Sequence, residues 1–118
     1  MNSSFLVEFV IKCGCGGFMK ICFNFEWDEN KNKINQKKHH VGFQLASKVF
    51  YDDNLIEFKD YEHSQSEDRY IAIGMVKKIL FVSYTVRYGD TIRIISARRA
   101  TKDEEALYYA NQNIDRFF

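Results

Sequence analysis

The sequence predicts an α+β domain in which a meandering antiparallel β-sheet is flanked by two N-terminal helices and one C-terminal helix. The chain has 118 residues, which is enough for one hydrophobic core and too few for two. Hydrophobic residues make up 46% and aromatic residues 16% of the chain, so global disorder is excluded. The apolar pattern has helical spacing in residues 43–50, strand-like runs from 54 to 96, and helical spacing again after 101.

The first predicted elements are a strand and two helices. The aromatic residues of CFNFEW (22–27) alternate as in a strand. Asp28 is a good N-cap residue, and residues 29–38 contain helix formers and charges but few apolar side chains, so this helix should be mostly exposed. After the short break HHVG, residues 43–50 predict a second helix with an apolar stripe formed by Phe43, Leu45, Ala46, Val49 and Phe50.

Four β-rich runs and a closing helix make up the rest of the chain. The runs are separated by short turns such as RYGD and predict strands at residues 55–60, 69–75, 79–86 and 91–96. Residues 22–27 should join the same sheet. Thr101 and Glu104 form the T-x-x-E pattern of a capping box, which predicts a helix over residues 101–112. All three helices should cover one face of the sheet.

Residues 1–18 differ in character from the remainder. The Gly- and Cys-rich break CGCGGF (13–18) separates them from Met19, where a segment with a clear local pattern begins. We expect residues 1–18 to be an N-terminal extension outside the natural domain, with translation starting at Met19 and residues 19–118 forming a single domain. The alternative is a functional N-terminal arm.

Charge is distributed unevenly, although the net charge is only +1. Two basic segments, residues 31–40 and 87–102, flank an acidic segment at residues 52–68. A nearly neutral chain can therefore present a basic face that binds phosphate groups. The small net charge and the lack of a recognisable DNA-reading helix argue against DNA binding by the domain itself.

Cysteine usage and hydropathy indicate a cytoplasmic protein without a metal or a cofactor. Cys13, Cys15 and Cys22 are odd in number, Cys13 and Cys15 are too close for ordinary disulfide geometry, and a zinc site would lack a fourth ligand. Free thiols in a reducing compartment are therefore expected. The histidines have no convincing ligand spacing. No apolar run approaches the roughly 18 residues of a membrane span, and the N-terminal stretch makes a poor signal peptide.

The segment IRIISARRAT (92–101) places two arginines between a hydrophobic strand and the start of a helix. A helix N-terminus stabilises an anion, so Arg98 and Arg99 there could hold a phosphate group. The alternative is that they pair with Asp103, Glu104 or the acidic segment, and the residues alone leave both possibilities open.

Three further features could contribute to the same chemistry. Arg93 alternates with isoleucines and should project from the opposite face of its strand. His39 and His40 could supply a base, an acid or only a cation at a helix C-terminus. Glu67 and Arg69 are two residues apart and would point to the same side of a strand, either as a structural pair or as part of an RNA-cleaving site.

Several motifs of this sequence, taken together, resemble those of the BrnT family. The members of this family are toxins of bacterial type II toxin–antitoxin systems. The resemblance covers residues 19–110 in collinear order. It rests on FEWDENKNKINQKKHHVGF (25–43), on Glu67 and Arg69 followed by AIG (72–74), on YT (84–85) with Gly89, on IRIISARRAT (92–101), and on Glu104 with Tyr108.

The resemblance implies a RelE-like fold and a metal-independent endoribonuclease that inhibits translation by cleaving RNA. In this chemistry the ribose 2′-OH attacks the adjacent phosphorus, and guanidinium groups offset the charge that develops. It also implies neutralisation by a BrnA-type antitoxin with a ribbon-helix-helix domain, through which alone the protein would contact operator DNA.

The expected site residues follow from the matching positions. Catalytic roles are expected for His39, Glu67, Arg69, Arg93, Arg98 and Arg99, with His39 or Glu67 as the base. RNA-binding roles are expected for Lys38 and Tyr108, and for Arg87 in the second basic segment.

The chain departs from the family pattern at two positions. His40 replaces the glycine of the common K-H-G-V, which leaves the local turn geometry open, and Glu105 stands where the family often has arginine. The alternative function is a non-catalytic co-repressor that only binds the antitoxin. The intact Lys38, His39, Glu67 and arginine set favours catalytic activity.

Overall fold

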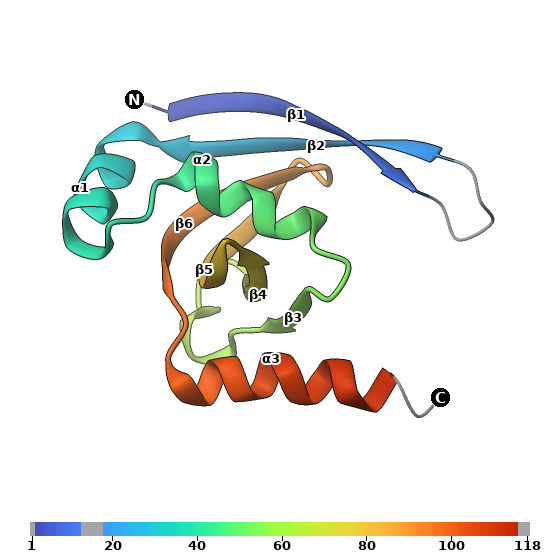
Figure 1. Cartoon of the computed structure of the whole chain (residues 1–118). Coiled ribbons are helices and arrows are strands. Elements are labelled where there is room, and N and C mark those ends of the chain that lie inside the picture. The colour runs from blue at the N-terminus through green and yellow to red at the C-terminus, as the bar shows by residue number, and fades with distance from the viewer. Residues whose placement is uncertain (1, 13–17, 116–118) are drawn as a thin grey trace.

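The computed structural model describes the backbone of residues 2–12 and 18–115 and the side chains of residues 24–112. It confirms the expected mixture of helices with one sheet (Figure 1). In chain order the elements are β1 (Asn2–Lys12), β2 (Phe18–Asp28), α1 (Glu29–His39), α2 (Phe43–Ala46), the 3-10 helix η1 (Ser47–Tyr51), β3 (Ile56–Lys59), the 3-10 helix η2 (Tyr61–His63), β4 (Arg69–Val76), β5 (Lys78–Arg87), β6 (Thr91–Arg99) and α3 (Lys102–Asp115).

Six strands form one sheet in the order β1-β2-β6-β5-β4-β3. Strands β3 to β6 are the predicted antiparallel meander. The strand of the first half joins it, but in parallel, through residues 24–26 of β2 paired with residues 91–93 of β6. Parallel neighbours need a long crossover connection, and the segment from α1 to β5 supplies one here.

Strand β1 is the outermost strand at one edge of the sheet. It pairs antiparallel with β2 along its full length, from Asn2 opposite Asp28 to Lys12 opposite Phe18. The backbone of residues 2–12 therefore belongs to the sheet, and whether it belongs to the natural domain stays a prediction. The side chains of the cysteines, expected to be free thiols, lie outside the described residues.

Helices α1 and α2 and the 3-10 helix η1 lie over one face of the sheet (Figure 1). The core between them contains Phe25, Phe43, Val49 and Val82, all fully buried. Gly74 permits this packing, because a Cβ at this position would lie 2.9 Å from the Cβ of Val49. The glycine of AIG therefore allows η1 to approach β4.

Helix α3 packs on the opposite face, so the expectation that all helices share one face is wrong. Strands β4 and β5 carry apolar side chains on both sides, which gives the sheet a second apolar surface. This surface forms a smaller core that consists of Ile56, Ile71, Ile73, Ile79 and Tyr108.

Two predicted elements are shorter than expected. The helix predicted over residues 43–50 is α-helical only to Ala46 and continues as the 3-10 helix η1. The Ser47 hydroxyl donates to the carbonyl oxygen of Gln44 at 2.7 Å, a local bond that competes with regular helix geometry. Strand β3 comprises only Ile56–Lys59. In the described part of the chain, no helix is long and apolar enough to cross a membrane.

Candidate functional site

A β-bulge decides which arginines of β6 share a face. Thr85 pairs with Arg93, but Ser83 pairs with Ser96, so Ile95 is an extra residue on β6. Beyond the bulge the alternation of side chains is reversed. Arg98 therefore lies on the same face as Arg93, whereas Arg99 lies on the face covered by α1 and α2.

On the face of Arg98, side chains from three strands and the β3–β4 connection surround a pocket of about 330 Å³, which we call the sheet-face pocket. It is lined by Asp60, His63, Arg69, Ile71, Phe81, Ser83, Ile95, Ser96 and Arg98. The pocket thus combines guanidinium groups, hydroxyls, an imidazole and one aromatic ring. Such groups can bind the phosphate, the ribose and the base of an RNA nucleotide.

His63 and Asp60 form an imidazole–carboxylate pair in the wall of this pocket. Among the described residues that line the pocket, no other such pair occurs. The Nδ1 atom of His63 is 2.8 Å from Oδ2 of Asp60. The connection that carries them is fastened to β4, because the Ser64 hydroxyl donates to the Asp60 carbonyl and accepts from the Arg69 amide at 2.9 Å. His63 is therefore held beside Arg69 with its Nε2 atom not engaged by Asp60.

Arg98 is held rigidly at the edge of the sheet-face pocket. Its guanidinium donates to both carboxylate oxygens of Glu104, at 2.7 and 3.0 Å, and lies 4.0 Å from the ring centroid of Phe81. Glu104 also accepts the Thr101 amide at 2.8 Å, as the predicted capping box requires. The bond to Arg98 is the largest of the effects that hold the pKa of Glu104 below its ordinary value.

Arg69 has the least satisfied guanidinium of the group. Its Nη2 is 4.0 Å from Oε1 of Glu67, whose other oxygen accepts from Arg87 at 3.3 Å. The Nε of Arg69 is buried and has no hydrogen-bond partner among the described residues. The side chain lines the sheet-face pocket and is 34% exposed, so its outer nitrogens, and not the buried Nε, are the atoms that a phosphate oxygen can reach.

Arg93 lies on the same face but outside the pocket. Its Nη1 is 3.2 Å from Oε1 of Glu26, and both side chains are largely buried, at 14% and 9% exposure. This ion pair joins β2 to β6 at the parallel junction. The structure thus gives Arg93 a clear structural contact, and the catalytic role expected for it from the sequence stays a prediction.

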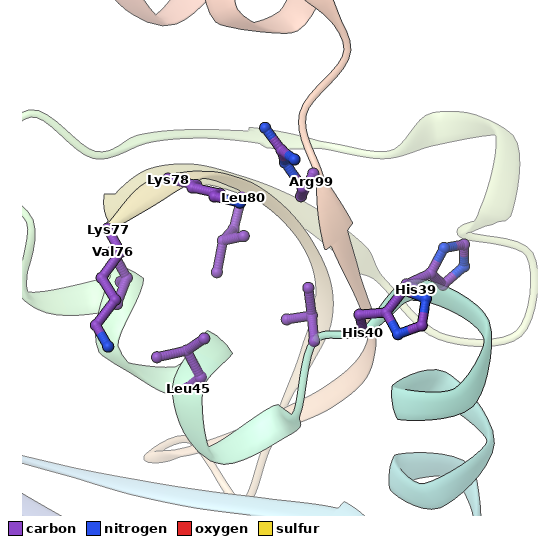
Figure 2. A pocket seen from close by; sticks show the side chains of 9 residues that line it. His39, His40, Leu45, Val76, Lys77, Lys78, Leu80 and Arg99 are labelled. Carbon is purple, nitrogen blue, oxygen red and sulfur yellow. The ribbon is translucent and has the colours of Figure 1, made fainter.

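His39 and Arg99 meet in a different pocket, on the opposite face (Figure 2). His39 and His40 come from the end of α1, Arg99 from the end of β6, and Lys77 and Lys78 from the β4–β5 turn. Lys38, the exposed neighbour of His39, does not line either pocket. The expected catalytic residues are therefore divided between two faces.

His40 adopts the conformation that explains the glycine of the family pattern. It caps α1 with φ 60° and ψ 26°, and its amide donates to the carbonyl oxygen of Gln36 at 2.9 Å. This left-handed C-cap favours glycine, so histidine keeps the turn geometry at some conformational cost.

Tyr108 lies in the core instead of on the surface, with 2% exposure. Its hydroxyl donates to Oδ2 of Asp52 at 2.5 Å, and the same oxygen accepts the Met75 amide at 2.7 Å. Burial raises the pKa of Tyr108, and the Asp52 carboxylate adds to the effect. Tyr108 therefore fastens α3 to β4 and to the segment after η1.

Comparisons with known proteins show the family to which the chain belongs. A family model described as the ribonuclease toxin BrnT of type II toxin–antitoxin systems matches residues 27–104. This chain belongs to the BrnT family. The crystal structure of the Brucella abortus ribonuclease toxin BrnT matches with a TM-score of 0.53 and 26% identity, over 64% of this chain and 94% of that one. No curated protein matches significantly.

The BrnT match contains every residue of the sheet-face pocket. Of these, sequence reasoning selected Arg69 and Arg98 and missed the role open to His63. The signal available was the D-x-x-H spacing of Asp60 and His63, which is weak without knowledge that the connection returns to β4. Lys77 and Lys78 were missed because a basic turn is usually only solvated.

One cluster of the described residues could hold a cation in principle. Ligand atoms of Asp60, Glu62 and His63 lie within 4.8 Å of one another. Glu62 and His63 are exposed, and His63 Nδ1 is already engaged by Asp60. Exposed groups of this kind commonly occur without an ion, and the geometry supports the imidazole–carboxylate pair more directly.

Proposed function

We propose that this BrnT-family toxin is an endoribonuclease whose reaction takes place in the sheet-face pocket. The observation that carries the proposal is the His63–Asp60 pair in a pocket that also contains Arg69 and Arg98. A base with an orienting carboxylate and guanidinium groups that bind the phosphate are parts suited to RNA cleavage by the 2′-OH.

His63 is the base in this proposal. Its Nε2 takes the proton of the ribose 2′-OH while that oxygen bonds to phosphorus, and the P–O5′ bond breaks to leave a cyclic phosphate. The 5′-oxygen takes a proton from water. Asp60 holds the imidazole through Nδ1 and stabilises the imidazolium that forms, as a carboxylate does behind a catalytic histidine. Glu67 is less suited to this role, because one of its oxygens is 3.3 Å from Arg87 and the other is 4.0 Å from Arg69.

Arg69 and Arg98 bind the phosphoryl oxygens, which gain negative charge in the transition state. The Glu104 carboxylate and the Arg99 carbonyl accept three of the five N–H donors of Arg98, which leaves two for the phosphate among the described contacts. Because the guanidinium of Arg98 is already fixed by Glu104, it needs no reorganisation during the reaction. Each such donor is typically worth about 2.7–4 kcal/mol of transition-state stabilisation.

The biological role follows from membership of a toxin–antitoxin family. We propose a RelE-like, metal-independent toxin that acts in the cytoplasm and inhibits translation. Its partner would be a BrnA-type ribbon-helix-helix antitoxin, through which the complex reaches operator DNA. Lys38 and Arg87 would contact RNA beyond the cleaved phosphate.

A cleavage assay with purified protein tests the mechanism. In the presence of EDTA, the protein should cut RNA to leave a 2′,3′-cyclic phosphate, and a 2′-deoxy substitution at the cut site should prevent cleavage. His63→Ala should lower the rate by about 10²–10⁴-fold. His39→Ala, the matched control on the opposite face, should cleave at nearly the wild-type rate. Equal losses in both variants would contradict the assignment of the base.

The ion pairs of the arginines favour one alternative, a co-repressor without catalysis. Arg87, Arg93 and Arg98 all have carboxylate partners, which a purely structural role would also produce. Inducible expression of the protein alone separates the two functions. Growth arrest with RNA fragmentation supports the ribonuclease, and normal growth with intact RNA supports the co-repressor.

A further inference from the structure

The pocket opposite the sheet-face pocket has a composition of its own. It encloses about 400 Å³, and its rim carries the side chains of His39, His40, Lys77, Lys78 and Arg99 (Figure 2). Its floor is aliphatic, formed by Val41, Leu45, Val76 and Leu80. We call it the histidine–lysine pocket.

The positive charge at the rim of the histidine–lysine pocket is not neutralised by the other residues that line the pocket. No carboxylate is among the described residues that line it, whereas Arg87, Arg93 and Arg98 on the other face all have carboxylate partners. Lys77 and Lys78 are both exposed, and Lys77 occupies the tight β4–β5 turn with φ 60°. Charge complementarity therefore calls for an acidic partner.

The floor indicates the class of that partner. RNA-binding surfaces stack bases on aromatic rings, and no aromatic residue is among the described residues that line this pocket. An aliphatic floor buries an apolar side chain instead, and a cationic rim binds carboxylates beside it. A protein segment with a large apolar residue flanked by Asp or Glu matches both features.

We propose that the histidine–lysine pocket is a docking site for an acidic, apolar-anchored segment of the antitoxin. The inference rests on the toxin–antitoxin assignment and not on the catalytic mechanism. Because this pocket lies on the face opposite the sheet-face pocket, the segment anchors the antitoxin to the toxin without occupying the place where RNA is cut.

Binding measurements with the intact toxin and its cognate antitoxin test the proposal. The double reversal Lys77→Glu with Lys78→Glu should raise the Kd of the complex at least tenfold, mainly through slower association and with a weaker dependence on salt. The matched control, Lys31→Glu with Lys33→Glu, reverses two exposed lysines of α1 that do not line the pocket, and it should change the Kd less than threefold.

A floor variant and the RNA readout complete the experiment. Leu45→Ala should speed dissociation of the antitoxin, and thermal melting of each variant verifies that it is folded. An unchanged antitoxin Kd in both pocket variants would overturn the proposal. Weaker RNA binding with an unchanged antitoxin Kd would reassign the pocket to RNA. Because antitoxin binding is measured directly, a toxin that fails to cleave RNA contradicts only the proposed mechanism.

Discussion

At the scale of single residues, chemistry depends on which way each side chain points. Arg98 and Arg99 are neighbours on one strand and therefore point to opposite faces, and the bulge at Ile95 decides that Arg98 is the one that shares a face with Arg93. Arg98 then meets Phe81, Glu104 and the His63–Asp60 side of the sheet, whereas Arg99 meets lysines and histidines. The same residue type thus serves two different sites.

This separation predicts different outcomes for two adjacent substitutions. Arg98→Ala removes a phosphate donor from the sheet-face pocket, so RNA cleavage should fall by about a hundredfold or more. Arg99→Ala should leave the cleavage rate close to that of the wild type. Arg98→Lys retains the charge but not the two-pronged geometry and should also be impaired. Loss of cleavage in Arg99→Ala with an active Arg98→Ala would contradict this assignment.

The Arg98–Glu104 pair also predicts a dependence of stability on pH. Because Arg98 lowers the pKa of Glu104 in the folded state, the pair stabilises the protein above the ordinary glutamate pKa near 4.5, and this contribution is lost as the pH falls through the lower folded pKa. Glu104→Gln should therefore destabilise the protein near pH 7, and the difference from the wild type should shrink at acid pH. Urea unfolding of both proteins at several pH values measures this difference in the free energy of unfolding. A difference independent of pH would show that the carboxylate charge does not contribute.

At the scale of elements, local signals identified most helices and strands, and long-range packing decided the rest. Asp28 accepts the amides of Asn30 and Lys31 at 2.9 and 3.3 Å, as its N-cap position predicted. The Thr101–Glu104 capping box is likewise present. The face on which α3 packs could not be predicted, because it depends on Tyr108 meeting Asp52, a residue 56 positions earlier.

Tyr108 provides a test of how α3 is fastened. Tyr108→Phe should lower the free energy of unfolding by about 1.5–3 kcal/mol, because the hydrogen bond to the Asp52 carboxylate is lost. The matched control Tyr109→Phe alters a half-exposed ring and should have little effect. If Tyr108 instead contacted RNA, Tyr108→Phe would reduce cleavage without reducing stability. Denaturant unfolding and the cleavage assay together separate the two roles.

At the scale of the whole molecule, the sequence predicted the meander and named two of the residues that line the sheet-face pocket, Arg69 and Arg98. Glu67 lies in a bend before β4, so the expected strand alternation does not apply to it, although its carboxylate is 4.0 Å from Arg69. The bulge that adds Arg98 to the face of Arg69 leaves no local mark in the sequence. The parallel junction of β2 with β6, sealed by Glu26 and Arg93, joins residues 67 positions apart. Such pairings depend on the complete sheet, so they cannot be predicted from the pattern of neighbouring residues.

The fold also raises the question of whether residues 1–18 contribute to the stability of the domain. Strand β1 is the edge strand of the sheet and pairs with β2. The BrnT match starts at residue 27, beyond β1.

Deleting residues 1–18 should therefore change the free energy of unfolding by less than about 1 kcal/mol, which corresponds to a shift in Tm of a few degrees. RNA cleavage and antitoxin binding should also be preserved, since neither pocket is lined by residues before 39. A larger loss in Tm would show that β1 is an integral strand, because β2 would then need a neighbour on its outer edge to keep its pairing with β6.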